Sequence, residues 1–278
     1  MISVKLQGRL GNQMFQYAFA NSLSNKLKTI YFLDAKEICD LIKYFKLNKW
    51  DILVSKIYSY RIIQKIINKL FLKRQFIQIG HEYPNDIAKQ FSNNTQYSVF
   101  CQSASYFNNS MNKIHQYFTV KSIYVDMFKW KYSKIFDNHK VIVVHFRIGD
   151  YLEFGNESLG GKNLILPSDY YDKCFSMIDS LDNYKVIFIS DSIEEIIKRY
   201  NKKDNFLFES NNEIIDFLLL INADKLIISN SSFAWWGAYL NIKKAKVYAP
   251  RFWLGFKIKK EYPVGIYNNL NWELVEIN

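Results

Sequence analysis

The chain has 278 residues, of which 49% are hydrophobic and 17% are aromatic, so it can bury a core and is not a disordered protein. This length fits one large domain or two domains of ordinary size. The formal net charge of +11 favours partners that carry phosphate: a nucleic acid, an anionic membrane surface or a nucleotide-linked substrate.

The first elements predict the start of a parallel sheet. Residues 2–6 have the character of a short strand, residues 14–27 carry apolar side chains at helical spacing, and residues 29–33 predict a second strand. This β–loop–α–β order is typical of α/β domains. The loop QGRLGNQ at 7–13 is neither G-x-G-x-x-G nor a P-loop, so it indicates only a close approach of the backbone at a strand end.

Residues 56–74 predict a single amphipathic helix. Basic side chains fall four apart on one face, and isoleucines and a leucine supply another: Arg61, Lys65, Lys69 and Lys73; Ile62, Ile63, Ile66, Ile67 and Leu70. Such a helix either has a solvated basic face or contacts an anionic membrane surface peripherally.

From residue 140 onward, strands and helices alternate again. Strands are expected at 141–145, 185–190, 225–229 and 245–250, and helices at 167–181, 192–200, 212–223 and 232–240. The predicted class is therefore α/β, with two doubly wound halves: an N-terminal domain at 1–135 and a C-terminal domain at 136–278. Ligands of such sheets bind outside the carboxyl ends of the strands.

The segment HFRIGDY follows a buried strand at such a carboxyl end. Arg147 can offer a planar set of donors to phosphate oxygens, and Gly149 permits a close turn. Asp150 could accept a proton or hold Arg147, and His145 could contact a base or a phosphate. The alternative is a structural Arg–Asp pair beside a hydrogen-bonded histidine.

The segment SNSSFAWWGAYL joins another strand end to a helix. Asn230, Ser231 and Ser232 can cap that helix, and the same hydroxyl and backbone N–H groups can hold an anion. Trp235 and Trp236 are expected to pack in the core.

Two acids complete the candidate set. Asp191 ends a third strand, where it is either a ligand contact or part of a helix cap. Asp216 is a lone acid on an apolar helix and needs a partner if it is buried, such as the N–H edge of a guanine.

The sequence contains neither an Asp-x-Asp pair nor a metal-ligand spacing of its four histidines, so no metal site is expected. Its cysteines, Cys39, Cys101 and Cys174, are widely spaced, which predicts reduced thiols in a cytoplasmic protein. Neither a signal-peptide pattern nor an apolar run of about 18 residues is present, so no membrane span is expected.

Three ordered motifs resemble those of the bacterial α-1,2-fucosyltransferases, glycosyltransferase family 11. They are GRLGNQMFQYA near the N-terminus, HFRIGDY in the middle and SNSSFAWWGAYL near the end, with IFISDS between the last two. The resemblance implies a GT-B architecture, with two Rossmann-like halves facing a cleft. It implies GDP-β-L-fucose as donor, inverting transfer to the 2-hydroxyl of a terminal galactose, and no cofactor or metal.

The same resemblance assigns roles to residues. Arg147 would hold the β-phosphate of the leaving GDP, His145 would lie by the nucleotide, and Asp150 would be the base or an organiser. The donor-binding set it implies is Gly11, Asn12, Gln13, His145, Arg147, Asp191, Asp216, Asn230, Ser231, Ser232 and Phe233. Ile148 departs from the family pattern, which has a second Arg there, although strand alternation points positions 147 and 148 to opposite sides.

Three other functions remain open from the sequence. A different GDP-sugar transferase would use the same motifs, and a non-catalytic nucleotide- or glycan-binding protein would bind without turnover. A nucleic-acid-binding protein would fit the net charge, but the lysines are spread along the chain rather than clustered. The expected acceptor is a galactose-terminated oligosaccharide of a surface polysaccharide such as an O-antigen, and a lipid-linked form of it is one hypothesis.

Overall fold

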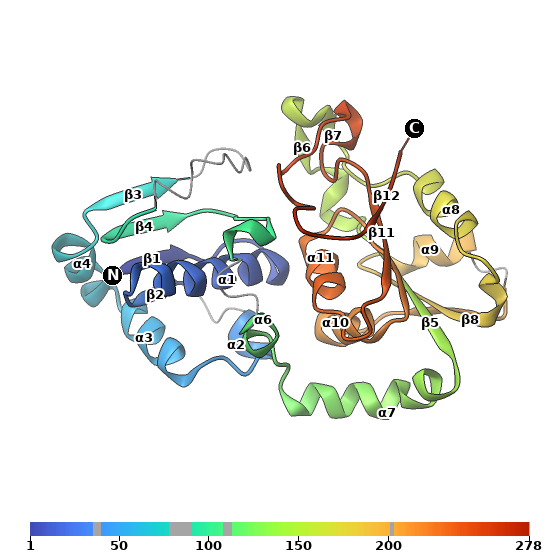
Figure 1. Cartoon of the computed structure of the whole chain (residues 1–278), viewed down its shortest axis with the longest axis horizontal. Helices are drawn as coiled ribbons and strands as arrows, with labels where there is room; N and C mark the ends of the chain where they lie inside the picture. Colours follow the sequence, from blue (N-terminus) through green and yellow to red (C-terminus); the bar gives the residue numbers. More distant parts are fainter. Residues whose placement is uncertain (36–39, 78–90, 108–112, 201–202, 278) are drawn as a thin grey trace. The chain divides into compact units, whose positions relative to one another are not determined.

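The computed structural model describes residues 1–35, 40–77, 91–107, 113–200 and 203–277. The chain forms two compact units, and each is described by itself (Figure 1). The first unit comprises residues 1–121 and 263–269, and the second comprises residues 122–262 and 270–278.

The first unit is built on a four-stranded, fully parallel sheet in the order β2-β1-β4-β3. Its strands are β1 (Ile2–Lys5), β2 (Tyr31–Asp34), β3 (Arg74–Ile77) and β4 (Thr95–Ser98). Its helices are α1 (Leu10–Leu27), α2 (Asp40–Tyr44), α3 (Lys49–Ser59), α4 (Arg61–Leu70) and α6 (Ile114–Tyr117).

Helix α1 is buried over most of its length and is fixed to the carboxyl end of the sheet by one glutamine. The Gln16 side chain accepts a hydrogen bond from the Gln7 backbone N–H at 2.9 Å and donates one to the Val99 carbonyl at 3.1 Å. Since Gln7 follows β1 and Val99 follows β4, this buried amide holds the ends of two neighbouring strands together.

The single helix predicted over residues 56–74 is wrong, because the structure has two helices with a break at Tyr60. Tyr60 is extended, with φ −70° and ψ 116°. The break lets Tyr58 turn inward, where its ring stacks on Phe32 at 4.8 Å and its hydroxyl donates to the Asn68 side chain at 2.6 Å. Both helices thereby place one face against β2 and its neighbours.

The second unit contains a six-stranded parallel sheet in the order β12-β11-β10-β5-β8-β9. Its strands are β5 (Lys140–Phe146), β8 (Tyr184–Ser190), β9 (Phe206–Glu209), β10 (Lys225–Ile227), β11 (Lys246–Pro250) and β12 (Glu273–Val275). A short antiparallel pair, β6 (Gly155–Asn156) and β7 (Gly161–Lys162), lies outside this sheet. The order of the six strands is that of a doubly wound Rossmann fold. From β5 the chain adds β8 and β9 on one side, and it then returns to add β10, β11 and β12 on the other side, so the strand order reverses between β5 and β10.

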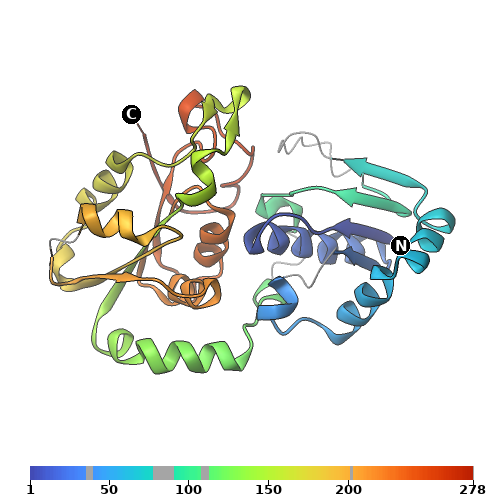
Figure 2. The same ribbon diagram turned by 180° about the vertical axis from the view of Figure 1, so that it is seen from behind.

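Helices cover both faces of this sheet. They are α7 (Ser122–Asn138), α8 (Ser168–Ser176), α9 (Ile193–Tyr200), α10 (Glu213–Asn222) and α11 (Ser232–Tyr239). Figures 1 and 2 show α8 and α9 on one side of the sheet and α10 and α11 on the other. Trp235 and Trp236 are fully buried, which confirms that they pack in the core.

The expected domain boundary between residues 135 and 136 falls inside α7, which belongs as a whole to the second unit. Tyr132 explains this, because its buried hydroxyl donates to Glu209 of the second unit at 2.8 Å. Residues 263–269 return to the first unit, where the Ser103 hydroxyl donates to the Gly265 carbonyl at 2.6 Å.

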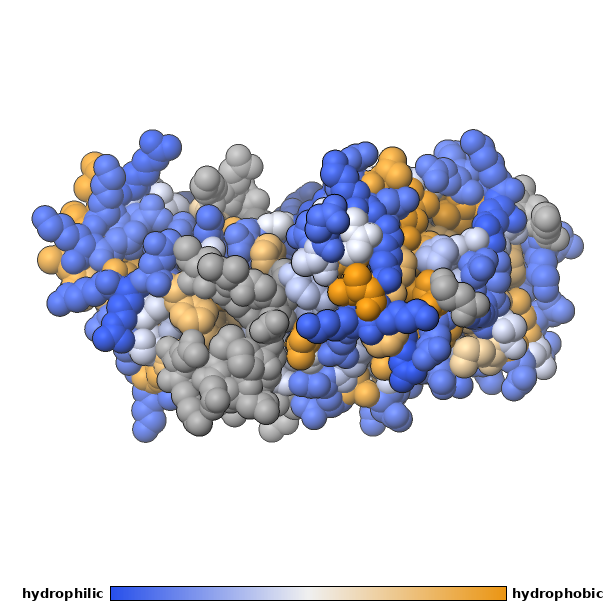
Figure 3. Space-filling view, turned by 90° about the horizontal axis from the view of Figure 1, so that it is seen from above, coloured by the Kyte–Doolittle hydropathy of each residue, from blue (hydrophilic) through white to orange (hydrophobic). Residues whose placement is uncertain are grey.

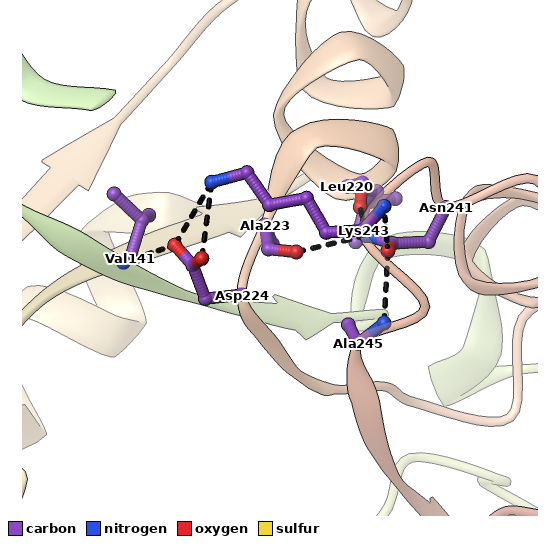
Figure 4. A network of polar contacts seen from close by, with 7 residues as sticks. All are labelled: Val141, Leu220, Ala223, Asp224, Asn241, Lys243 and Ala245. Carbon is purple, nitrogen blue, oxygen red and sulfur yellow. Dashed lines mark hydrogen bonds and ion pairs between the residues drawn. The ribbon is translucent and has the colours of Figure 1, made fainter. Parts of the chain in front are cut away.

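A polar network holds the amino end of β5 against α10 (Figure 4). The buried side chain of Asn241 donates to the carbonyls of Leu220 and Ala223 at 2.9 and 3.0 Å. It also accepts from the N–H groups of Lys243 and Ala245 at 3.0 and 2.9 Å. Asp224 binds the Val141 N–H at 2.8 Å and pairs with Lys243 at 3.0 Å. The strand that carries HFRIGDY is therefore fixed at its opposite end.

Across the residues described, none of the helices has both the length and the apolar character needed to cross a membrane.

Candidate functional site

The carboxyl ends of β5, β8 and β10 bring together most of the predicted site residues of the second unit. Register pairs His145 of β5 with Ile189 of β8, and Val144 of β5 with Ile227 of β10. The segments that follow these strands carry Arg147, Asp191 and Ser229 to Ser232. β5 and β10 flank the point where the strand order reverses, which is where ligands of such sheets bind.

His145 is a buried, neutral side chain at this point. Its Nδ1 lies 2.9 Å from the Ser229 hydroxyl, so one bond joins the ends of β5 and β10. Burial first, and the nearby Arg147 charge second, lower the pKa of His145 to about 3. The ring also lies 5.7 Å from Phe233 on α11. His145 can therefore accept or donate a hydrogen bond to a ligand, but it is a weak base at neutral pH.

Arg147 lies between two carboxylates. Its guanidinium is 2.7 Å from Asp150 and 3.1 Å from Asp191, and its side chain is only 14% exposed. It also lies 5.5 Å from the centre of the Tyr151 ring. The pairing expected for a structural Arg–Asp pair is thus present, and it fixes the guanidinium in one orientation at the sheet edge.

Asp191 is the more firmly held of the two acids. Its other oxygen accepts the Ile148 backbone N–H at 2.9 Å. A Cβ on Gly149 would lie 2.8 Å from the Asp191 carboxylate, so only glycine leaves room for this contact. Asp150, whose side chain is 52% exposed, has more freedom to meet a ligand.

The segment after β10 forms the N-terminus of α11. Ser231 is the N-cap, it is buried, and its hydroxyl makes no capping bond. Asn230 donates to the Leu164 carbonyl at 3.0 Å, and its buried side-chain oxygen has no partner within the described ranges. Ser232 is the first helical residue. Hydroxyl and N–H groups at a helix start suit an anion.

Asp216 lies in the first turn of α10 with its carboxyl largely buried. Asn211 donates to it at 2.9 Å, and burial raises its pKa to about 7. Asn211 also lines an open hollow of about 420 Å³ between α7 and α10, together with Asp126, Met127, Trp130, Lys131, Asn212 and Ile215. A carboxyl that loses solvation without a direct cationic partner costs stability when it ionises, as binding-site acids often do.

The predicted residues of the first unit gather at the carboxyl end of β1. Gly8 has φ +76°, and a Cβ there would lie 2.4 Å from the Asn12 amide nitrogen. Asn12 accepts from the Gln102 side chain at 2.7 Å, and Gln13 donates to the Gly8 carbonyl at 3.0 Å. Gly11 is buried in α1. This is the close backbone approach expected from the loop, and donor binding by Gly11, Asn12 and Gln13 stays a prediction.

Several residues of the site were not selected from the sequence. Ser229 holds His145, Tyr151 donates to the Asn230 carbonyl at 3.0 Å, and Asn211 holds Asp216. Ser229 stands at a predicted strand end, which was a usable signal. Tyr151 contacts a residue 79 positions away in the sequence, so no local pattern could reveal its role. Asn211 contacts a residue only 5 positions away, which inspection of the local sequence could have found.

The described residues hold no group of three or more His, Cys, Asp or Glu side chains placed to bind a metal ion. Cys101 and Cys174 are free and buried, while Cys39 falls outside the described residues.

Comparison with known proteins gives one consistent family. The model of glycosyl transferase family 11 matches residues 1–267. The O-antigen biosynthesis glycosyltransferase WbnK of Escherichia coli is 28% identical, over 95% of this chain and 99% of that protein. An α-1,2-colitosyltransferase of E. coli is 27% identical, over 91% of this chain and 92% of that protein.

The fold resembles that of the fucosyltransferase NodZ from Bradyrhizobium, with a TM-score of 0.53, 12% identity and coverage of 86% of this chain and 92% of that one. This likeness confirms the expected GT-B-like fold, with Rossmann-like parallel sheets. Because the family match extends over both units and includes all three motifs, the chain belongs to glycosyltransferase family 11.

Proposed function

We propose that the protein transfers L-fucose from GDP-β-L-fucose to the 2-hydroxyl of a terminal galactose, with inversion at the anomeric carbon. The observation that carries the proposal is the arrangement of Arg147, its two acids and the α11 N-terminus at the strand-order reversal. A NodZ crystal soaked with GDP-fucose provides a fold relative that takes this donor. The E. coli α-1,2-colitosyltransferase supports the same linkage.

During the reaction, negative charge develops on the departing diphosphate, beside Arg147 and the N-terminus of α11. The acceptor oxygen forms a bond to the anomeric carbon as the bond from that carbon to the β-phosphate oxygen breaks. The electron pair leaves with GDP, and Arg147 and the N–H and hydroxyl groups at Ser231 and Ser232 stabilise the growing charge. No step requires a metal, since these groups supply the positive potential, and we propose transfer without a metal or cofactor.

The acceptor proton passes to Asp150 in this proposal. Asp191 is already held by both Arg147 and the Ile148 N–H, so it acts as the organiser of the guanidinium. Asp150 shares Arg147 but is the more exposed carboxylate. His145, neutral and bonded to Ser229, contacts the nucleotide rather than serving as the base.

Guanine recognition is assigned to Asp216 and Phe233. A carboxylate can accept from both N–H donors on the guanine edge. The centre of the Phe233 ring lies 5.7 Å from that of His145 and 5.8 Å from that of Phe217. The named role of WbnK supports a place in O-antigen assembly. We propose that the acceptor is a lipid-linked oligosaccharide. The free thiols of Cys101 and Cys174 support a cytoplasmic location.

A second candidate is transfer of another sugar to the same hydroxyl. The relative named as a colitosyltransferase favours it, because that protein matches over nearly the same length. The residues described above grip the diphosphate and the base, which different GDP-sugars share.

The test is a transfer assay with EDTA present. Purified protein is mixed with a panel of GDP- and UDP-sugars and a β-galactoside, and products are read by mass spectrometry with linkage analysis. A deoxyhexose at O2 of galactose from GDP-fucose alone supports the proposal. Transfer from a different GDP-sugar supports the second candidate, and GDP binding without any turnover points to a binding protein.

A further inference from the structure

Helix α4 exposes an apolar stripe that none of the described residues of the first unit covers. Ile62, Ile66 and Leu70 recur every four residues along one side of the helix and are 75%, 51% and 56% exposed. Surface leucines and isoleucines are ordinary when scattered, but three on one face of a ten-residue helix form a continuous strip.

The stripe is not needed to hold the helix in place. The opposite side of α4 does that, with Ile67 packed against the Phe32, Tyr58 and Leu72 cluster. On the same side the Gln64 amide donates to Asp34 at 2.9 Å, and Asn68 accepts from Tyr58. Folding therefore gives no reason for apolar residues at 62, 66 and 70.

A row of cations runs beside the stripe. Arg61, Lys65 and Lys69 recur with the same four-residue spacing and are exposed, and Lys73 and Arg74 continue past the helix end. None of these five side chains forms an ion pair with any residue in the ranges described. The single acid between residues 49 and 76 is Asp51, and its carboxylate accepts from the buried Tyr17 hydroxyl.

Helix α3 extends the apolar surface up to α4. Trp50, Leu53, Ile57 and Tyr60 follow at intervals of three and four residues, and they are 67%, 46%, 41% and 58% exposed. Tyr60 caps both helices, so the two stripes meet there. At the left end of Figure 3, where α4 lies, apolar atoms reach the surface among hydrophilic ones.

We propose that α4, with the end of α3, is a docking surface for an anionic lipid bilayer, lying in the interface with Ile62, Ile66 and Leu70 inserted. A helix with an apolar stripe beside a basic row has the pattern of interfacial helices, and each basic residue near an anionic surface adds to the attraction. A second copy of this chain would bring like charges together. A nucleic acid would leave the apolar stripe without a partner.

The inference goes beyond the proposed transfer reaction and does not depend on it. The membrane proposal is tested by vesicle binding, so it can be correct even if the proposed donor is wrong. It would hold the first unit at the surface where a lipid-linked acceptor lies.

The experiment is co-sedimentation of the full chain with vesicles of phosphatidylcholine, with or without phosphatidylglycerol. Binding is expected to the vesicles that contain phosphatidylglycerol and to be at least about tenfold weaker to neutral ones. Ile62→Ser/Ile66→Ser and, separately, Lys65→Gln/Lys69→Gln should each lower the partition coefficient by about tenfold or more.

Matched controls lie in the second unit. Ile242 is 64% exposed, so Ile242→Ser removes a comparable apolar side chain, and Lys244→Gln/Lys260→Gln removes two exposed charges. These should leave binding within about twofold of the parent. If the isoleucine variant unfolds at a lower temperature, the lysine variant decides the matter, because Lys65 and Lys69 are exposed.

Three results would overturn the proposal. They are the absence of binding to either vesicle, equal loss in the α4 variants and the controls, and a dimer in light scattering that Ile62→Ser/Ile66→Ser converts to monomer. The last would assign the surface to a second copy instead.

Discussion

Single residues at the β5 end show how a charge can be both structural and available. Arg147 pairs with Asp150 and Asp191, yet its planar guanidinium carries more donors than these two contacts occupy. The acids position the group, and a diphosphate can bind the remaining donors. The two readings that the sequence leaves open for this cluster are therefore compatible.

Replacement of Arg147 tests this position directly. Arg147→Ala should lower kcat at least about 100-fold, since a charge-stabilising donor contributes roughly 3 kcal/mol to the transition state. Arg147→Lys should recover only part of the rate, because an ammonium cannot bridge both acids in one plane. Steady-state transfer kinetics measure both.

Arg199→Ala is the control for that loss. Arg199 forms a 2.6 Å pair with Asp172, and both side chains are about half exposed, at 44% and 50%. Exposed pairs contribute little, so this variant should keep near-parental turnover. Equal turnover in the Arg147 variants would remove Arg147 from the mechanism.

Asp216 predicts a pH dependence of GDP binding. Its pKa, raised to about 7 by burial, means that it is mostly protonated at pH 6 and mostly ionised at pH 8. A carboxylate that accepts guanine N–H donors should then bind GDP about tenfold more tightly at pH 8 than at pH 6. Calorimetry at both values measures the ratio.

Asp216→Asn should bind GDP weakly and lose this dependence. The same variant should be more stable than the parent at pH 8. The pKa of Asp216 in the folded state lies above its ordinary value of 3.8, so its contribution to stability relative to Asn is lost as pH rises through about 7. An unchanged GDP affinity in Asp216→Asn would leave the acid without a role in binding.

At the scale of elements, the contact between α10 and α11 sets where Asp216 and Ser232 lie. Gly237 permits this contact, because a Cβ there would lie 2.5 Å from the Cβ of Leu220. In the proposed site, α10 carries the residue that binds guanine and α11 carries residues that bind the diphosphate. The separation of the two helices therefore decides how well the donor fits.

Gly237→Ala sets two effects against each other. Helix propensity favours alanine by about 1 kcal/mol, while overpacking costs about 1 to 3 kcal/mol. Since the neighbouring atom is a Cβ with little freedom to move, we expect net destabilisation and weaker GDP binding. Thermal unfolding measures the change in stability, and calorimetry measures the affinity for GDP. Gly237→Ser should destabilise the protein more than Gly237→Ala does. A rise in the unfolding temperature of Gly237→Ala would contradict the close contact.

At the scale of the whole molecule, stability and activity are anchored at opposite ends of the second sheet. The Asn241 network lies at the amino end of β5 and makes four hydrogen bonds, while the candidate site lies at the carboxyl end (Figure 4). We therefore expect that loss of the Asn241 network leaves the geometry of the candidate site unchanged.

Asn241→Ala should therefore lower the free energy of unfolding by about 2 to 4 kcal/mol, because buried carbonyl and N–H groups lose their partners. Turnover per folded molecule should stay near the parental value at a temperature where the variant is folded. Denaturant unfolding and a transfer assay measure the two quantities. Lys243→Ala removes a partly exposed pair at 3.0 Å and should cost under about 1 kcal/mol.

The sequence by itself determined the α/β class and four of the six strands in the large sheet of the second unit, β5, β8, β10 and β11, but it did not predict β9 or β12. Those strands are continuous buried runs such as Val141 to Val144, whose pattern is local and unambiguous. It also determined which polar residues stand at strand ends, because in a parallel sheet those positions share one edge. The motifs HFRIGDY and SNSS were found for this reason.

Only the tertiary structure decided features that depend on distant partners. The break at Tyr60 follows from Tyr58 stacking on Phe32, and the place of α7 follows from Tyr132 bonding Glu209. Arg147 pairs with Asp191, 44 residues further along the chain, and His145 pairs with Ser229, 84 residues further along. Such contacts carry no local pattern, since they exist only once separate strands lie side by side.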